Sequence, residues 1–218
     1  MIVSGIDTLI IRDLGLCDYE PVFQKMQRFS DQRSVDTSDE IWILEHYPVY
    51  TLGRAAKKNH ILDPGEIPIV QIDRGGQVTY HGPGQIVIYL LLDVRRNKLG
   101  VRQIVTAMEN AVIDLLKSES INSSSRPDAP GVYVNDEKIA ALGLRIKRGM
   151  SYHGLCFNVD MDLSPYDGIN PCGFENLKVT QLNDLLADYS LQDVKQKLTS
   201  QLIQHLNLES KTQVTLSA

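Results

Sequence analysis

One cysteine of this 218-residue chain stands where its thiol could react. Cys172 lies in "GINPCGFEN", and the neighbouring Pro171 and Gly173 are typical of a rigid, irregular loop that leaves side chains exposed. A thiolate in such a loop is a nucleophile, and the chemistry it offers is acyl transfer from one thioester to another. A cysteine is also commonly a small buried apolar residue, so both interpretations stay open for Cys172 on local chemistry alone.

The other two cysteines favour a structural interpretation. Cys17 follows a strand-like run, and Cys156 lies in "GLCFNV", where it belongs either to the core or to the wall of a pocket. Three cysteines have neither the number nor the spacing of a disulfide framework, and no C-x-x-C pair suggests zinc. We therefore expect no metal site.

A glycine-rich stretch, "RGGQVTYHGPGQ" (residues 74–85), is the second candidate for a functional site. Gly75 and Gly76 permit positive φ angles and let a ligand approach the backbone. Side-chain donors surround them, namely Arg74, Thr79, Tyr80 and His81. The stretch matches neither the dinucleotide fingerprint nor the P-loop, and a strand rather than a helix follows it. It is either a ligand-binding loop between two strands or a hairpin loop that an arginine and a histidine stabilise.

The elements that must position these residues can be predicted from apolar patterns. Short runs rich in Ile, Val and Leu predict strands near residues 8–11, 41–45, 67–72 and 85–93, and residues 131–159 read as a three-stranded meander with turns at 135–137 and 147–149. Apolar residues at helical spacing predict helices at 101–120, at 190–206 behind Ser190, and after Pro21. This mixed order indicates an α+β or mixed α/β fold.

Length and composition are those of an ordinary soluble protein. We expect one domain over residues 1–218, with 43% hydrophobic and 22% charged residues. A formal net charge of −5 without long basic runs argues against nucleic acid as the main partner. Neither a long apolar span nor a signal peptide is apparent, so we expect a cytoplasmic protein that does not enter membranes.

Four segments together resemble one enzyme family. "RGGQVTYHGPGQIVIY" (74–89) resembles the signature of the lipoyl(octanoyl) transferases, also called octanoyl-ACP:protein N-octanoyltransferases. "EKIAALGLRI" (137–146), "SYHGLCFNVDMDLSPY" (151–166) and "GINPCGF" (168–174) resemble further site segments of this family in the same order. The resemblance covers residues from about 46 to about 182 and implies a mixed β-sheet core flanked by helices, as in the catalytic domain of biotin and lipoate protein ligases.

The resemblance implies a reaction and its catalytic residues. An octanoyl group would pass from octanoyl-acyl carrier protein to a specific lysine of lipoyl domains, in 2-oxo acid dehydrogenase complexes or the glycine cleavage H protein. This is the first step of lipoate biosynthesis by protein lipoylation. Cys172 would carry the acyl group as a thioester and Lys138 would be its acid–base partner, although a lysine in "NDEK" is otherwise typical of a solvated turn. Such chemistry needs neither ATP nor a cofactor, and the family suggests a monomer.

The same resemblance assigns the substrate-binding residues. They are expected to form an acyl pocket from three segments: Arg74, Gly75, Gly76, Gln77, Val78, Thr79, Tyr80 and His81; Ala141, Leu142 and Gly143; Gly154, Leu155 and Cys156. His81 would orient the lysine or the substrate, and His153 would play a supporting part.

Two alternatives remain at this point. An ATP-dependent lipoate or biotin protein ligase of related fold also uses a glycine-rich strand–loop–strand, but a thiol is superfluous to its adenylate chemistry. A non-catalytic module could bind the acyl group or its carrier without turnover. Activity with octanoyl-carrier protein in the absence of ATP distinguishes the transferase from both.

Overall fold

The structure, a computed structural model, describes residues 6–175 and 177–217. An eight-stranded mixed sheet runs through the molecule in the order β11-β1-β2-β6-β10-β9-β8-β7. Strands β11, β1 and β2 are parallel and the remaining neighbours are antiparallel. The strands are β1 (Thr8–Cys17), β2 (Asp39–His46), β6 (Gln85–Leu91), β7 (Ser124–Ser125), β8 (Gly131–Val134), β9 (Glu137–Lys147), β10 (Met150–Asn158) and β11 (Thr212–Ser217).

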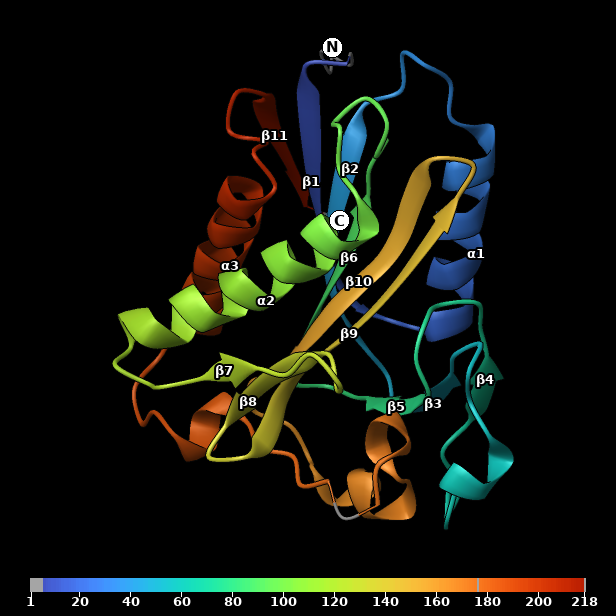
Figure 1. The fold of residues 1–218 in the computed structure, drawn as a ribbon, viewed down its shortest axis with the longest axis vertical. Helices are drawn as coiled ribbons and strands as arrows, with labels where there is room; N and C mark the ends of the chain where they lie inside the picture. The colour runs from blue at the N-terminus through green and yellow to red at the C-terminus, as the bar shows by residue number, and fades with distance from the viewer. Residues whose placement is uncertain (1–5, 176, 218) are drawn as a thin grey trace.

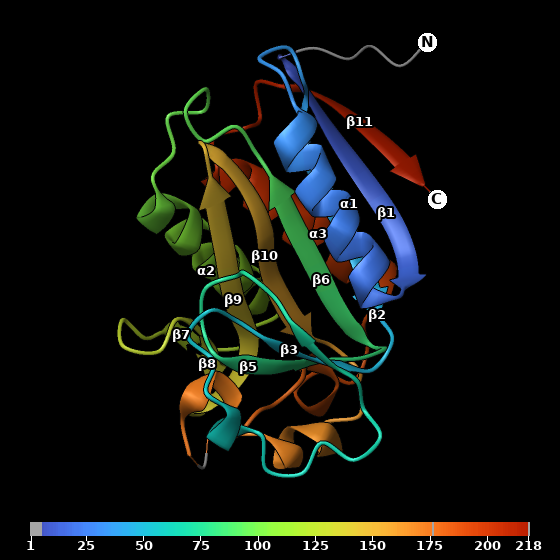
Figure 2. The ribbon, with the colours of Figure 1, turned by 90° about the vertical axis from the view of Figure 1, so that its right-hand side faces the viewer.

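A second, three-stranded sheet lies at one end of the large one, in the order β4-β3-β5 (Figure 1). Its strands are β3 (Val49–Leu52), β4 (Ile69–Gln71) and β5 (Val78–His81). The short 3-10 helices η1 (Lys58–His60), η2 (Ser164–Gly168), η3 (Pro171–Gly173) and η4 (Leu182–Asp184) belong to the long connections. η2 and η3 lie at the same end of the molecule as the small sheet (Figure 2).

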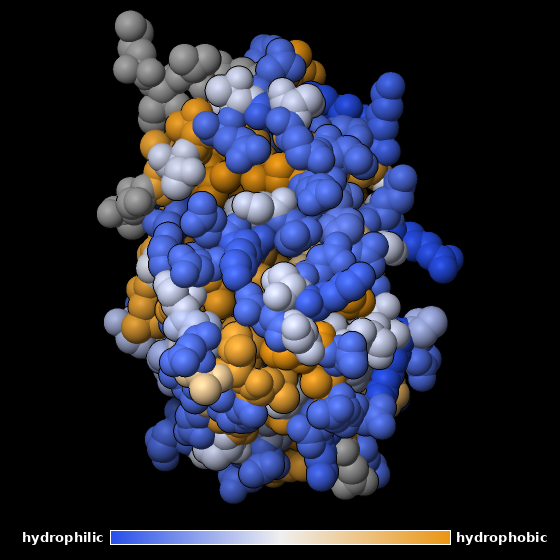
Figure 3. All heavy atoms as spheres, turned by 90° about the vertical axis from the view of Figure 1, so that its left-hand side faces the viewer, coloured by the Kyte–Doolittle hydropathy of each residue, from blue (hydrophilic) through white to orange (hydrophobic). Residues whose placement is uncertain are grey.

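Three helices cover the two faces of the large sheet. α1 (Tyr19–Gln32) packs on one face, and α2 (Val101–Ser118) and α3 (Leu191–His205) pack on the other (Figures 1 and 2). α2 buries the apolar stripe that its sequence predicts, Ile104, Ala107, Met108, Ala111, Val112, Leu115 and Leu116, and this stripe belongs to the main core. Viewed from the α2–α3 side, most of the surface is hydrophilic, and hydrophobic side chains show in both its upper and its lower part (Figure 3). No helix in the described residues is long and apolar enough to cross a membrane.

The mixed α/β architecture predicted from the sequence is confirmed. The meander is present as β8, β9 and β10, and Ser190 caps α3, because its side chain accepts a hydrogen bond from the Asp193 amide at 3.3 Å. The third predicted helix is also present and starts two residues before Pro21.

Several strands differ from the predictions, and β3 and β7 were not predicted. β5 lies inside the glycine-rich stretch, where we expected only loop, and all four of its residues are buried against β3. β11 was not predicted, and it pairs with β1 from the opposite end of the chain. The predicted strand at 67–72 shortens to Ile69–Gln71. For β5, β11 and β4 the deciding factor is pairing with a strand distant in sequence, which a local pattern does not encode.

Gly84 fixes the turn that leads from the glycine-rich stretch into β6. Its amide donates to Glu45 Oε2 at 2.8 Å, and its carbonyl accepts from the amides of Val159 and Asp160 at 3.1 and 3.0 Å. The residue has φ +84°, and a Cβ there would lie 1.7 Å from the Asp160 carbonyl oxygen. A side chain at this position would therefore force apart the ends of β6 and β10.

Substitution of Gly84 by alanine should lower the free energy of unfolding by about 3 kcal/mol or more, because a backbone clash adds to the positive-φ strain. Gly15→Ala is the matched control: Gly15 also has positive φ, +63°, but no atom lies within 4 Å of its Cβ position. The control should lose only about 1 kcal/mol in urea unfolding. Equal losses of unfolding free energy in the two variants would show that the clash at Gly84 does not contribute to the destabilisation.

Candidate active site

The centre of the site is a contact between Lys138 and Cys172. The Lys138 ammonium donates to the Cys172 sulfur at 2.9 Å, across 34 positions of sequence, and the lysine is only 3% exposed. Lys138 is the second residue of β9, and its backbone is held from the side. Its amide donates to the Lys178 carbonyl at 2.9 Å, and its carbonyl accepts from the Thr180 amide at 3.0 Å. The segment that follows η3 therefore extends the sheet and brings the loop of Cys172 to the lysine.

Cys172 has an unusual backbone conformation. Its φ of +56° lies in the left-handed region that non-glycine residues seldom adopt, and Gly173 follows with φ +79°. The turn is held by the Gly173 amide, which donates to the Asn170 carbonyl at 2.9 Å, and by the Asn170 amide, which donates to the His60 carbonyl at 2.8 Å. Because the loop is anchored at several points, it can hold a strained residue whose thiol is half-buried.

Burial and charge act in opposite directions on Lys138. Burial lowers the pKa of the ammonium, but the Cys172 sulfur, through its charge and its hydrogen bond, and Tyr133 raise it, and the net pKa lies above the ordinary value. Lys138 is therefore an ammonium at neutral pH. A cation this close to a thiol is the kind of neighbour that favours the thiolate, the reactive form of a cysteine.

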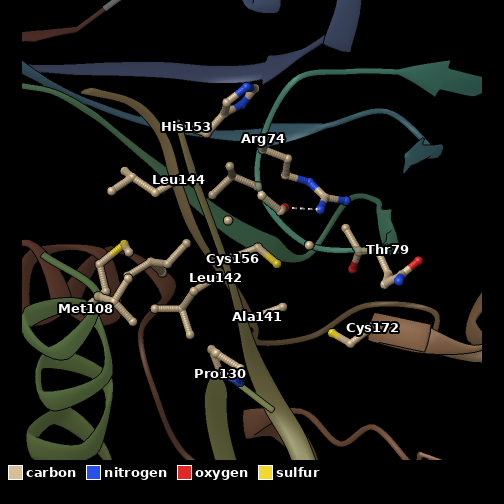
Figure 4. A pocket seen from close by; sticks show the side chains of 18 of the residues that line it. Arg74, Thr79, Met108, Pro130, Ala141, Leu142, Leu144, His153, Cys156 and Cys172 are labelled. Carbon is tan, nitrogen blue, oxygen red and sulfur yellow. Dashed lines mark hydrogen bonds between the residues drawn. The ribbon is translucent and has the colours of Figure 1, made fainter. Parts of the chain in front are cut away.

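A cavity of about 430 Å³ opens beside this pair. Residues of β9 and β10 form one wall, the glycine-rich stretch lies across it, and Val101, Val105 and Met108 of α2 close the apolar end. Figure 4 shows the sulfur atoms of Cys156 and Cys172 directed into the same space. The volume lies within the range of about 300–1,000 Å³ of small-molecule sites.

Glycine at position 143 makes room for Arg74. A Cβ on Gly143 would lie 2.7 Å from the Arg74 Cδ, so the arginine stem lies directly on the strand. The adjacent Gly75 amide donates to the Leu144 carbonyl at 3.1 Å. The glycine-rich stretch thus runs along β9 and holds its polar side chains over the cavity.

Most residues assigned to substrate binding in the sequence line this cavity. They are Arg74, Gly75, Gly76, Gln77, Val78, Thr79, His81, Ala141, Leu142, Gly143, Gly154, Leu155 and Cys156, and Cys172 lines it as well. Tyr80 does not line it, because its ring packs between Tyr50 and Tyr166 at centroid distances of 5.6 Å. Lys138 lines a smaller adjoining cavity that shares Thr79, Ala141 and Cys172 with the large one.

A hydrogen-bonded chain orders the polar side of the cavity. Arg74 Nη2 donates to the Thr51 side-chain oxygen at 2.9 Å, and Thr51 Oγ1 lies 3.3 Å from His81 Nε2. His81 Nδ1 lies 2.7 Å from Gln85 Oε1. Since the amide oxygen of Gln85 only accepts, Nδ1 carries the proton, and Nε2 accepts from the threonine hydroxyl.

The histidines on this side are neutral at pH 7. Burial lowers the pKa of His81 to about 3 and that of His46 to about 4. Burial also lowers the pKa of His153, against the opposing effect of Asp73, whose carboxylate lies 3.0 Å from His153 Nε2. These rings therefore act as uncharged hydrogen-bonding groups.

Comparison with known proteins decides the family. Residues 18–203 match the model of the lipoyl protein ligase A/B catalytic domain. An octanoyltransferase of Pseudomonas entomophila is 55% identical over 98% of both chains, and one of Hahella chejuensis is 53% identical over 95% of this chain and 92% of its own. The chain belongs to the octanoyltransferase family. The enzyme is therefore an acyltransferase.

Solved structures share the fold of this octanoyltransferase family member at much lower sequence identity. A putative lipoate protein ligase from T. acidophilum superposes with a TM-score of 0.74 at 13% identity, covering 94% of this chain and 88% of that chain. Biotin protein ligase from Aquifex aeolicus gives 0.53 at 12% identity, covering 93% and 70%. The predicted likeness to biotin and lipoate ligase catalytic domains is confirmed at the level of the fold.

Several cavity residues were not predicted from the sequence. α1 and β6 contribute Tyr19 and Tyr89, α2 contributes its apolar end, and the loop before β8 contributes residues 128–130. The α2 sequence held a usable signal, since Val101 and Val105 continue its apolar stripe at helical spacing. Tyr89 is the last residue of the glycine-rich signature segment 74–89, but it was not assigned to the pocket, and Tyr19 carried no sequence signal, because only the folded sheet brings α1 over β6.

Thr51→Val in this enzyme should disrupt the polar side of the cavity. Valine keeps the shape but leaves His81 Nε2 without its donor and Arg74 Nη2 with only the Thr51 carbonyl, also at 2.9 Å. We expect a loss of about 1–3 kcal/mol of unfolding free energy, because buried polar groups lose partners, and a higher KM for the acyl donor.

The control is Thr199→Val, which removes a buried hydroxyl that bonds only the Lys195 carbonyl within α3, at 2.7 Å. This variant should lose less than about 1 kcal/mol and keep its KM. Urea unfolding and steady-state kinetics measure both quantities, and an unchanged KM in Thr51→Val would contradict the role of the chain in holding the cavity wall.

Proposed function

We propose that the protein transfers an octanoyl group from octanoyl-acyl carrier protein to a lysine of a lipoyl domain through a thioester on Cys172. The observation that carries this proposal is the 2.9 Å contact between the buried Lys138 ammonium and the Cys172 sulfur at the edge of the cavity. A buried cation beside a thiol enriches the nucleophile that thioester exchange needs. The names of the relatives, octanoyltransferase, supply the acyl group.

The first half-reaction charges the cysteine. The Cys172 thiolate attacks the octanoyl carbonyl, a new C–S bond forms, and the bond to the carrier's phosphopantetheine sulfur breaks. Lys138 gives its proton to the departing thiolate and becomes a neutral amine. The product is a thioester of similar energy to the donor, so no ATP is required.

The second half-reaction discharges it. The neutral amine of the acceptor lysine attacks the octanoyl thioester, an amide bond forms, and the Cys172 sulfur leaves as a thiolate. Lys138 takes the proton that the new amide nitrogen loses, which restores the ammonium–thiolate pair. One proton on Lys138 thus serves as acid and then as base.

The cavity provides the site for the octanoyl chain. Burial of most of its methylenes at about 0.8 kcal/mol each supplies about 5 kcal/mol of gross binding free energy. The three segments assigned to substrate binding contribute most of the walls, with Leu142 and Leu155 on the apolar side. The proposal includes lipoyl domains of 2-oxo acid dehydrogenases and of glycine cleavage H protein as acceptors. It also includes a cytoplasmic, monomeric enzyme, as the sequence analysis expects.

Mass spectrometry of the intact protein tests the thioester. Mixed with octanoyl-carrier protein without ATP, the wild type should gain one octanoyl group and lose it when a lipoyl domain is added, whereas Cys172→Ser should gain none. Cys156→Ser is the matched control, because Cys156 lies in the same cavity wall and burial raises the pKa of its thiol to about 11. It should still form the adduct. An adduct only with octanoate and ATP would instead identify an adenylating ligase.

The proton transfers predict different pH behaviour for the two half-reactions. The charge of the Cys172 sulfur raises the pKa of Lys138, and acylation removes this charge. Burial, which lowers the pKa of Lys138, remains. The pKa of Lys138 should therefore be lower in the acyl-enzyme than in the free enzyme. In single-turnover kinetics the discharge rate should rise with pH and level off above this lowered pKa.

Lys138→Arg separates the two roles further. Arginine stays protonated, so it can stabilise a thiolate but can neither give up a proton nor accept one. We expect acylation to slow less than discharge, because a thiolate can leave without a proton whereas the new amide nitrogen must lose one, and we expect discharge to slow by about 100-fold or more. Discharge of the acyl-enzyme at the wild-type rate would contradict the assignment of Lys138 as the base of the second half-reaction.

A further inference from the structure

Lys138 has a second hydrogen-bond partner besides the sulfur. Its ammonium donates to the Pro130 carbonyl at 3.2 Å, in the segment that leads into β8. An ammonium has three N–H donors, of which Cys172 and Pro130 take two, and the Tyr133 side chain also interacts with the ammonium. The position of the Pro130 carbonyl therefore helps to fix the orientation of the ammonium beside the sulfur.

Two side chains hold the backbone on either side of that carbonyl. The Tyr133 hydroxyl donates to the Ala129 carbonyl at 2.7 Å. Glu109 of α2 accepts from the Gly131 amide through Oε1 at 3.2 Å. Pro130 lies between these two anchored peptide groups, so its carbonyl is restrained from both directions.

The segment also lies in close contact with Lys138. Gly131 has φ +148°, and a Cβ there would lie 3.0 Å from the Lys138 Cε and 3.2 Å from its nitrogen. Only glycine lets the backbone come this near to the lysine stem. Any displacement of residues 129–131 would therefore change the position of the Lys138 ammonium.

Tyr133 contacts the ammonium a second time through its ring. The Lys138 nitrogen lies 5.1 Å from the ring centroid, within the range of cation–π attraction, and the tyrosine is 2% exposed. The Arg126 guanidinium lies 4.2 Å from the same ring centroid. Tyr133 thus fixes both the backbone that Lys138 contacts and the surface on which the ammonium rests.

Glu109 adds a negative charge near the pair. Burial raises the pKa of its carboxyl, whereas the Gly131 amide and the charge of Lys138 lower it. By reciprocity Glu109 favours the protonated form of Lys138. The charged and titratable groups near the lysine include Cys172 from η3, Tyr133 from β8 and Glu109 from α2, with Arg126 on the Tyr133 ring and Asp128 in the adjoining loop. Cys156 of β10, the pKa of whose thiol the Lys138 charge lowers, and Tyr166 of η2, which lines the same small cavity as Lys138, complete the surroundings among the described residues.

We propose that Glu109 and Tyr133 are positioning residues of the acyl transfer: they clamp residues 129–131 so that the Pro130 carbonyl and the Tyr133 ring hold the Lys138 ammonium on Cys172. The inference rests on the proposed role of Lys138 as acid and base. It assigns a function to a helix and a loop that lie outside the sequence motifs of the catalytic pair.

Paired substitutions separate the hydrogen bonds from the charge and the ring. Glu109→Gln keeps an oxygen for the Gly131 amide and removes only the charge, whereas Glu109→Ala removes both. Tyr133→Phe keeps the ring and removes the bond to Ala129, and Tyr133→Leu removes both. Asp114→Asn is the control on the same helix, because it neutralises a carboxylate that pairs with His205 at 2.8 Å instead.

The expected result is a graded loss in kcat with KM unchanged. Glu109→Ala and Tyr133→Phe should lower kcat about tenfold, Tyr133→Leu more, and Asp114→Asn not at all. Glu109→Gln should keep kcat near neutral pH within about threefold, but the midpoint of its discharge rate against pH should move to lower pH, because the neighbouring anion is gone.

Two results would overturn the inference. One is a lower melting temperature for Glu109→Ala and Tyr133→Phe with kcat per folded enzyme unchanged, which identifies a purely structural role. The other is a pH profile of Glu109→Gln that coincides with that of the wild type. Both differ from a failure of the proposed function, in which Lys138→Arg itself would discharge the acyl-enzyme at the wild-type rate.

Discussion

The site depends on a lysine that is kept out of water. An isolated buried ammonium is strongly unfavourable, so Lys138 persists at 3% exposure only because other groups compensate its charge. The Cys172 sulfur, the Pro130 carbonyl and the Tyr133 ring all contact it. These partners come from a loop near the small sheet, from the segment before β8 and from β8 itself. Several distant parts of the fold must therefore be in place before the lysine and the cysteine can meet.

Most helices and the local strand meander of this fold could be predicted from the sequence, whereas strand pairs between residues far apart in the chain could not. The α2 stripe, the Ser190 cap and the β8–β10 meander follow from spacing and turn residues close together in the chain. The β1–β11 and β3–β5 pairs do not, because β3, β5 and β11 are short strands whose pairing partners lie far away in the sequence. The residues near each of these strands in the sequence do not indicate which strand it pairs with.

The same distinction between local and long-range features applies to the residues of the candidate site. Cys172 and the glycine-rich stretch could be singled out because proline and glycine mark irregular backbone, and the structure gives Cys172 the φ of +56° that such a loop allows. The place of Lys138 beside it came only from the family resemblance, since a lysine after "NDE" is typical of a solvated turn. Glu109 could not be predicted at all: its role depends on the Gly131 amide, 22 positions away, and helix spacing assigns it only to a partly exposed face.

The proposed reaction uses one proton two times, first from an acid and then onto a base. A buried lysine suits this reaction better than an exposed lysine would. An exposed lysine with pKa near 10.4 holds only about 0.1% neutral amine at pH 7.5, too little for an efficient base. In the proposed mechanism the charged Cys172 sulfur raises the pKa of Lys138 in the free enzyme, where an acid is needed. Once the sulfur is acylated its charge is gone, and burial then lowers the pKa of Lys138 at the stage where a base is needed. In this proposal the charge of the sulfur sets the proton affinity of the lysine at each stage. Proteins described as lipoate protein ligases share this fold at 12–14% identity, so the fold alone does not determine the chemistry, and the proposal of a thioester depends on the cysteine–lysine contact.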